Sequence, residues 1–376
     1  MKILFVLENY LPHLGGVEVV FKNLCEGLVR QGFEVTILTH KIKGTASDEV
    51  LDGVKVHRVR SLGSRIMFSF CAIMPAFRYA KHADIIHTTA FNGAPPGWIA
   101  AKLRRKPVII HVHEVWIGMW DKVTSMSWIS AKIHNLLEKM IYFLPFSRYV
   151  CVSESTKRQL IRQNIQKEKV QVILNGYEEG FFDPKKYDGK KIRKGLDIDD
   201  KFVLFSWGRP GVSKGHDFAV LAMNVLKKTM PDARLVLMLG QKDKYKKRFD
   251  YLMDLIRKND LERQVIVVPS APYKELGNYL KAADCIIVPS LSEGFGYTTL
   301  EACEMNKPVI ATDNASIPEV IWGKYILVPP RDPDAIAEAV IKAKEKKYLE
   351  RKKRSFPWKS NIDDHIRMYK SLVKRT

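Results

Sequence analysis

Short runs of apolar residues recur along the whole chain, and stretches of helical length separate them. The runs occupy residues 2–7, 34–39, 84–87, 107–113 and 148–152 in the first half, and 202–206, 234–239, 264–268, 284–288, 308–311 and 325–328 in the second. This alternation predicts βαβ units and parallel sheets, hence an α/β fold. Several runs are apolar at every position, which is typical of strands that helices cover on both faces.

The repetition of this pattern predicts two Rossmann-like domains. A chain of 376 residues exceeds what one compact core usually holds and suits two. A polar stretch at 185–201 separates the halves, so we expect an N-terminal domain at 1–180 and a C-terminal domain at 181–356. Residues 362–373 carry apolar side chains at helical spacing and predict a last, amphipathic helix.

Composition narrows the class of protein. Hydrophobic residues make up 46% and charged residues 27%, as in an ordinary folded chain. No run reaches the roughly 18 apolar residues of a membrane-spanning helix, and the opening residues show no export signal. The five cysteines are scattered and form no CxxC pair, which favours reduced core thiols. We therefore expect a cytoplasmic protein.

The chain is strongly basic, because 62 Lys and Arg residues face 41 Asp and Glu residues, a net charge of +21. Such an excess favours an anionic partner: a nucleic acid, an anionic membrane face or a phosphorylated substrate. No signature of an RNA- or DNA-binding module is present, so we expect no nucleic acid partner.

Ligands of parallel sheets bind beyond the carboxyl ends of the strands, and four such loops carry candidate chemistry. In the first loop, residues 9–18, Gly15 and Gly16 stand at the start of a predicted helix over 17–30. Glycines there let an anion approach free backbone N–H groups. The GxGxxG fingerprint is absent, so a simple tight turn is the alternative.

The second loop begins with His111-Val112-His113-Glu114 at the end of a predicted strand. Residues two apart on a strand share a face, so both imidazoles are expected to point the same way. Three interpretations stay open: a metal-binding pair, a structural pair, or a strand-end His113 that serves the ligand cleft.

The third loop, residues 208–215, places Arg209 and Lys214 among glycines directly after a strand. Two cations in such a loop suit a diphosphate, since Arg binds two oxygens at once and Lys adds a point charge. The order of residues is not that of a Walker loop. A solvated basic turn is the alternative.

The fourth loop, residues 289–302, contains Glu293 and Glu301 with Gly-Phe-Gly between them. Bare N–H groups at the start of the following helix suit an anion, and carboxylates accept hydrogen bonds from hydroxyl pairs. The loop therefore suits a sugar and a ribose on either side of a diphosphate. By spacing alone, the two carboxylates also fit a general acid and base, or helix-capping charges. Asp197 and Asp199 lie in the polar linker and are read as solvated surface, so no metal is expected.

Together these residues resemble the family 4 retaining glycosyltransferases of the GT-B fold, from the first strand to the final helix. The most specific part of the resemblance is Glu293-x7-Glu301. It is joined by Gly15-Gly16-Val17-Glu18, Lys106-Pro107 before His113, Val152-Ser153-Glu154-Ser155, Leu174-Asn175-Gly176 with Phe182, Gly208-Arg209 with Lys214-Gly215, Ala283-Asp284 to Pro289-Ser290, Lys307-Pro308 to Thr312, and Ile317-Pro318-Glu319-Val320-Ile321.

The resemblance implies two Rossmann-like domains that face a central cleft, with a C-terminal helix, residues 357–376, crossing back to the first domain. It implies a donor site made of Gly15, Gly16, Arg209, Lys214, Glu293, Phe295, Gly296, Tyr297, Thr298 and Glu301. Residues 268–273 would frame the base. The implied catalytic residues are His113, Arg209, Lys214 and Glu293, and the implied acceptor-side residues are Tyr10, His13 and His113.

The reaction that the resemblance implies is sugar transfer from a UDP- or GDP-linked donor, with retention and without a metal or other cofactor. Two segments depart from the family pattern. Asn314-Ala315-Ser316 replaces a usual glycine pair, and Glu304-Met305-Asn306 replaces a turn of small residues and glycine. Both departures bear on details near the sugar and leave the class unchanged.

The acceptor is predicted from two segments of the first half, residues 66–78 and 115–148, which mix aromatic residues with Lys and Arg. This is the composition of an interfacial surface. With the net charge, it favours a lipid-linked or other glycan acceptor at an anionic membrane surface, and peripheral attachment to the cytoplasmic face. Ordinary core helices are the alternative. The rival functions are a sugar-nucleotide epimerase, a phosphorylase and, more weakly, a metal-dependent hydrolase.

Overall fold

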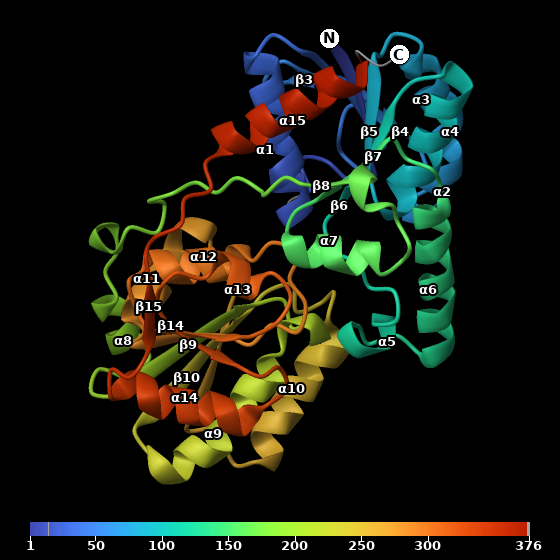
Figure 1. Cartoon of the computed structure of the whole chain (residues 1–376). Helices are drawn as coiled ribbons and strands as arrows, with labels where there is room; N and C mark the ends of the chain where they lie inside the picture. Colours follow the sequence, from blue (N-terminus) through green and yellow to red (C-terminus); the bar gives the residue numbers. More distant parts are fainter. Residues whose placement is uncertain (14, 374–376) are drawn as a thin grey trace. The chain divides into compact units, whose positions relative to one another are not determined.

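The computed structural model describes residues 1–13 and 15–373, so Leu14 of the first glycine loop and residues 374–376 of the expected last helix lie outside it. The chain divides into two compact units (Figure 1). Unit 1 comprises Met1–Ile117, Lys132–Glu178 and the chain from Phe356 onward. Unit 2 comprises Gly118–Ala131 and Glu179–Ser355.

Segment 118–131, which we expected in the N-terminal domain, therefore groups with unit 2. The physical reason lies in its short helix α5 (Trp120–Val123), which contacts the 3₁₀ helix η4 (Val212–Lys214). The carbonyl of Lys122 also accepts a hydrogen bond from Arg331 at 3.1 Å. The segment is thus held by side chains that follow it by some 90 to 210 residues in sequence.

Unit 1 contains an eight-stranded sheet in the order β3-β4-β2-β1-β5-β6-β7-β8, parallel except for the pairing of β3 with β4. Its strands are β1 (Lys2–Leu7), β2 (Glu34–His40), β3 (Asp48–Leu51), β4 (Val54–Val59), β5 (Ile85–Thr89), β6 (Val108–Val112), β7 (Arg148–Cys151) and β8 (Val170–Val172). Its helices are α1 (Gly16–Arg30), α2 (Arg65–Cys71), α3 (Ile73–Ala80), η1 (Phe91–Gly93), α4 (Ala94–Arg104), most of α6 (Trp128–Phe143), α7 (Glu154–Ile161), η2 (Lys167–Lys169) and α15 (Trp358–Val373).

Unit 2 contains a seven-stranded sheet in the order β11-β10-β9-β12-β13-β14-β15, in which only the edge strand β15 is antiparallel. Its strands are β9 (Phe202–Gly208), β10 (Ala233–Leu239), β11 (Val265–Pro269), β12 (Cys285–Val288), β13 (Val309–Thr312), β14 (Gly323–Val328) and β15 (Leu349–Arg351). Its further helices are η3 (Pro184–Lys186), α8 (Lys190–Gly195), α9 (His216–Thr229), α10 (Lys246–Lys258), α11 (Tyr273–Ala282), α12 (Tyr297–Glu304), α13 (Ile317–Val320) and α14 (Pro333–Lys344).

Every strand that the apolar runs predict is present, to within two residues at each end. The central strands are buried at almost every position, as β5, β6 and β12 are along their whole length, because helices cover both faces of each sheet. Sequence analysis missed four strands: β3, β4, β8 and β15. Of these, β3, β8 and β15 lie at sheet edges. The β3–β4 hairpin had a readable signal, since Asp52-Gly53 forms its turn with positive φ at both residues.

The last helix, α15, begins at Trp358 and packs in unit 1 against α1 (Figure 1). Its apolar face joins the core cluster that β1 and α1 share. Asn361 donates a hydrogen bond to the carbonyl of Leu174 at 2.7 Å. A Cβ at Gly176 would stand 2.2 Å from the Trp358 ring, so the glycine admits the indole. The predicted amphipathic helix is confirmed, four residues longer at its start.

Both sheets reverse their strand order beside the first strand of the unit: at β1 and β5 in unit 1, and at β9 and β12 in unit 2. Such switch points are where open α/β sheets bind ligands. The loops after β9 and β12 are the third and fourth of the predicted chemical loops. Among the described residues, no helix combines the length and apolar character needed to cross a bilayer.

Candidate active site

The loops after β9 and β12 are in direct contact in unit 2. Gly215 ends the first loop with φ of 64° and forms the N-cap of α9. A Cβ at this position would stand 2.0 Å from the carbonyl oxygen of Pro289, so only glycine permits the approach. The amide of Leu291 donates to the carbonyl of Ser213 at 2.7 Å. This contact brings Lys214 to the loop that carries Glu293.

Lys214 and Glu293 form an ion pair across the two loops, with side chains only 15% and 12% exposed. The Ser290 hydroxyl donates to the same carboxylate oxygen at 2.9 Å. The Ser316 hydroxyl donates to the backbone carbonyl of Glu293 at 2.9 Å. Ser290 and Ser316 therefore fix the position of Glu293, and the positive charge of Lys214 lies next to its carboxylate.

Glu301 lies on the second turn of α12 and is buried. Burial raises its pKa from 4.5 to about 7. A hydrogen bond of 2.8 Å from the Tyr273 hydroxyl, the Lys214 charge and the Trp207 side chain lower the pKa, while Glu293 raises it. Lys214, Glu293 and Glu301 thus influence one another electrostatically and form one cluster.

No side chain of the described residues caps the N-terminus of α12, where Gly296 is the N-cap residue. Gly296 precedes the helix with φ of 105°, and a Cβ there would stand 2.9 Å from Val320. Tyr297 and Thr298 begin the first turn, and burial raises the pKa of the Tyr297 hydroxyl. Phe295 is only 3% exposed, so its ring packs inside unit 2.

Arg209 differs from Lys214, because it is exposed and its guanidinium donates to the Tyr245 hydroxyl at 3.4 Å. It lies on the same loop as Lys214 but outside the buried cluster.

Next to Gly215, the buried His216 was missed by sequence reasoning. Its Nδ1 lies 3.2 Å from the Ser206 hydroxyl, and burial lowers its pKa to about 3, so it is neutral.

Tyr273, Trp207 and Ser290 were not predicted as partners of the two glutamates. Tyr273 was expected only within the stretch 268–273 that frames the base. Trp207 directly precedes Gly208, and Ser290 lies three residues before Glu293 on the same loop. Their proximity to the chemical loops was a signal, but their partners are set by the tertiary fold.

The two segments that depart from the family pattern support the Glu293 loop and α12. The Asn314 side chain donates to the carbonyl of Leu291 at 2.6 Å, and Ala315 takes a left-handed φ of 52°, where glycine is usual. Glu304 accepts hydrogen bonds from the Gly180 amide at 2.7 Å and from Lys353 at 3.0 Å. The substituted residues therefore make specific contacts in unit 2.

In unit 1, Gly15 forms the N-cap of α1 and Gly16 is its first residue. His13 Nδ1 lies 3.1 Å from a carboxylate oxygen of Glu18, which is largely buried. A Cβ at Gly15 would stand 2.6 Å from the other oxygen of Glu18. The start of α1 thus holds a carboxylate of the chain itself.

Tyr10, which we expected on the acceptor side, is 1% exposed within the core, so it belongs to the packing of unit 1.

His111 and His113 point the same way, as predicted from their spacing. Their rings stack at 4.6 Å between centroids, with planes 6° apart. His111 is fully buried on β6, whereas His113 follows the strand and is half-buried. Burial lowers the pKa of His113 to about 4, so its imidazole is neutral at pH 7. Its Nε2 has no hydrogen-bond partner among the described residues.

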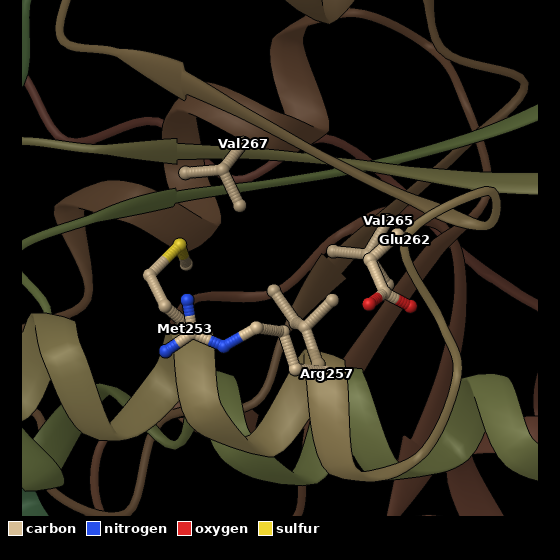
Figure 2. A pocket seen from close by; sticks show the side chains of 6 residues that line it. Met253, Arg257, Glu262, Val265 and Val267 are labelled. Carbon is tan, nitrogen blue, oxygen red and sulfur yellow. The ribbon is translucent and has the colours of Figure 1, made fainter.

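A further hollow on unit 2 lies apart from this chemistry. Figure 2 shows side chains from α10 and β11, with the loop between them, around a pocket of about 370 Å³. It is lined by Met253, Ile256, Arg257, Glu262, Val265 and Val267. None of these residues is among the predicted site residues, so the pocket gives no support to the proposed chemistry.

Comparisons with known proteins bear on both units. A family model described as Glycosyltransferase Family 4 matches residues 14–180, and one described as Glycosyl transferases group 1 matches residues 188–356. The chain is 30% identical to an uncharacterised glycosyltransferase of Methanocaldococcus jannaschii, over 90% of this chain and 88% of the relative. It is 25% identical to the phosphatidylinositol N-acetylglucosaminyltransferase GPI3 subunit of Saccharomyces cerevisiae, over 85% and 69%.

Among solved structures, the Anabaena protein HepE in complex with UDP-glucose matches with a TM-score of 0.73. The match covers 99% of this chain and 100% of that one, at 18% identity. This likeness confirms the expected α/β fold of two Rossmann-like domains of GT-B type.

Proposed function

This chain belongs to family 4 of the glycosyltransferases, and from that premise we propose that it transfers a sugar from a nucleotide-diphosphate sugar to an acceptor with retention of the anomeric configuration. One observation carries the proposal: Lys214, Glu293 and Glu301 form a single buried cluster at the switch point of the unit 2 sheet. A lysine, two carboxylates and a helix N-terminus are the groups that a diphosphate between two sugar rings needs.

In this proposal, different residues of the site bind different parts of the donor. Lys214, Arg209 and the amides at the start of α12 bind the diphosphate. Glu293 accepts hydrogen bonds from the sugar, and Glu301 accepts them from the ribose hydroxyls. The exposed Arg209 would leave its contact with Tyr245 to bind an incoming phosphate, while Lys214 exchanges part of its pairing with Glu293 for the donor. In unit 1, the start of α1 at Gly15 and Gly16, where His13 and Glu18 now lie, suits an anion.

Catalysis follows from where charge develops. The bond between the anomeric carbon and the diphosphate oxygen breaks, and its electron pair remains on the diphosphate. The acceptor oxygen forms the new bond on the same face of the sugar, and its proton passes to the departing phosphate oxygen. Preorganised cations and amides stabilise this charge more in the transition state than in the ground state. The neutral His113 of unit 1 is assigned to the acceptor side of the reaction.

The donor is proposed to carry UDP or GDP. UDP is the first choice, because the similar Anabaena structure holds UDP-glucose. A panel of UDP-, GDP- and ADP-sugars tests the choice by thermal shift, since a ligand that binds only the folded protein raises stability by RT ln(1 + [L]/Kd). The absence of a shift with every donor would count against the proposed donor site.

The acceptor is proposed to be lipid-linked and presented at an anionic membrane surface. Support comes from α6, which carries an exposed apolar stripe at alternating spacings of four and three residues: Ile129, Ile133, Leu136, Met140 and Phe143. Phe143 is 91% exposed. Exposed apolar residues gathered on one helix mark an interaction surface. Lys132 and Lys139 lie on the same helix, and the net charge of +21 favours an anionic partner.

A second exposed apolar group lies on α2 and α3. Ile66, Phe70 and Met74 are 56–68% exposed and recur every four residues. Phe68 of α2 and Tyr142 of α6 join the same core cluster, so both exposed groups belong to elements that cover one core. The yeast relative is a phosphatidylinositol N-acetylglucosaminyltransferase subunit, and its lipid acceptor adds to the support.

Liposome flotation with and without anionic lipid tests the membrane proposal. The wild-type protein should float with anionic vesicles, and Phe143→Ser should weaken flotation. Leu349→Ser, which alters an equally apolar side chain 62% exposed on β15, is the matched control. A concentration-dependent dimer that Phe143→Ser abolishes, without flotation of the wild type, would assign the stripe to a second copy of the chain and overturn the proposal.

The reaction itself is tested with donor and lipid extract, and the anomer of the product is read by NMR. An inverted anomer would overturn retention. Consumption of the donor without any acceptor would favour a sugar-nucleotide epimerase, and dependence on inorganic phosphate would favour a phosphorylase.

A further inference from the structure

Three histidines from separate elements meet in the interior of unit 1. They are His87 of β5, His111 of β6 and His365 of α15, and each is 0% exposed. His113 stacks on the outer side of His111. Sequence reasoning considered only His111 and His113, since 24 residues separate His87 from His111 and 254 separate His111 from His365.

Hydrogen bonds at the rim of the cluster engage one nitrogen of His365 and one of His87. His365 Nδ1 lies 2.8 Å from the carbonyl oxygen of Asn361, which can only accept, so Nδ1 carries the proton and Nε2 the lone pair. His87 Nδ1 lies 2.6 Å from the hydroxyl of Tyr369, whose oxygen can accept its proton in the same way. Histidines that bind metals usually donate their second ring nitrogen to such a partner.

The remaining ring nitrogens of the cluster have no hydrogen-bond partner among the described residues. They are Nε2 of His87, both nitrogens of His111 and Nε2 of His365, and all are buried. Buried polar atoms are rarely left unpaired in folded proteins.

The spacing of the rings fits one ion between them. One nitrogen from each histidine lies within 4.8 Å of the other two. The ring centroids are 5.4, 5.6 and 5.8 Å apart, a nearly equilateral triangle. Its centre is about 3.2 Å from each centroid, which is close to a zinc–nitrogen bond of about 2.0–2.1 Å plus the radius of an imidazole ring.

We propose that His87, His111 and His365 bind one zinc ion. Three imidazoles are a known zinc ligand set, and imidazole suits zinc far better than it suits magnesium or calcium, which take oxygen ligands.

The ion would join the last helix to the sheet of unit 1, since its ligands lie on β5, β6 and α15. It would also fix the His111 ring against which His113 packs. This role is structural and takes no part in the proposed sugar transfer. With three neutral ligands and no thiolate among them, we expect weaker binding than in cysteine-rich zinc sites.

The test uses the untagged full-length protein, stripped of metal, reloaded with zinc or cobalt and desalted. The protein should retain about one zinc ion per chain, and the cobalt form should show visible absorption that the metal-free protein lacks. No retained zinc and no cobalt absorption would overturn the proposal. Neither measurement requires a variant, so a failure of variants to fold leaves the test intact.

Variants locate the ion. His365→Asn should abolish retention of zinc, while His82→Gln, at an exposed histidine of unit 1, should leave it unchanged. Tyr369→Phe, which keeps the packing and removes only the hydroxyl at His87, should weaken zinc binding about 10- to 100-fold. Equal retention by wild type and His365→Asn would place the metal elsewhere and overturn the proposal, whatever the outcome of the transferase assays.

Discussion

Glu301→Gln should remove a pH dependence of stability that the wild-type protein carries. Burial raises the pKa of the Glu301 carboxyl from 4.5 to about 7 in the folded state. Between these values the folded protein holds a proton that the unfolded chain releases. The free energy of unfolding therefore falls as pH rises through this window. The stabilising contribution is complete below the unfolded pKa and lost above the folded one.

The magnitude follows from the two pKa values. The difference between 4.5 and about 7 corresponds to about 3 kcal/mol. Most of this, about 2–3 kcal/mol, should appear between pH 5 and pH 8. Glutamine keeps the size of the side chain and the contact with Tyr273, but it cannot ionise. The stability of the variant relative to the wild type should therefore rise by that amount from pH 5 to pH 8.

The assay is urea unfolding at several pH values, followed by tryptophan fluorescence, to which Trp207 of unit 2 contributes. Comparing wild type with variant at each pH cancels the titration of the groups that do not interact with Glu301. Glu338→Gln, at a side chain 70% exposed on α14, is the control and should show no such divergence. Parallel pH profiles of wild type and Glu301→Gln would refute the reasoning, because they would mean that the folded environment leaves this carboxyl unperturbed.

Three further changes address the loops and the last helix. In a thermal scan, Gly215→Ala should destabilise unit 2 by at least about 1–3 kcal/mol, because the left-handed backbone at this position strains any other residue. The close contact with the carbonyl of Pro289 adds to this cost. The control Gly195→Ala, at a position with open space around it, should leave the stability unchanged in the same scan. Lys214→Met should lower kcat/KM about 10- to 100-fold by removing a charged hydrogen bond to the donor, and unchanged kinetics would exclude that role. Gly176→Ala should lower the Tm of unit 1 by displacing α15, and hydrogen exchange confined to that helix is the readout that a general loss of stability would not give.

Much of the fold was predictable because its central strands are buried on both faces. The run of β12 is apolar at every position, and that of β1 is apolar at every position but the first. The missed edge strand β15 is exposed at all three of its residues, so no apolar pattern marks it. β3 alternates exposed and half-buried positions, so the Asp52-Gly53 turn is the sequence feature that indicates it.

The candidate site was also predictable only in part. The loops were predictable because glycines and charges cluster directly after strands, a local feature of the sequence. The partners within the site were not, because they depend on which loops the sheet order brings together. Lys214 pairs with a residue 79 positions away, and Tyr273 meets Glu301 across 28. Tyr10 was expected on the acceptor side because it stands in sequence beside the residues of the first glycine loop. Its side chain instead lies in the core of unit 1, which the local sequence does not indicate.

The docking of α15 in unit 1 sets an order for biosynthesis. Apart from 118–131, unit 2 is continuous from residue 179 to 355, so it is complete when that residue leaves the ribosome. Unit 1 is begun first, yet its core still lacks Ile362, Met368, Tyr369 and Leu372 at that moment. Domains usually fold in the order in which they are made. In this chain the first domain to be translated is the last to be finished, and until α15 emerges the part of α1 that packs against it stays uncovered and open to chaperones.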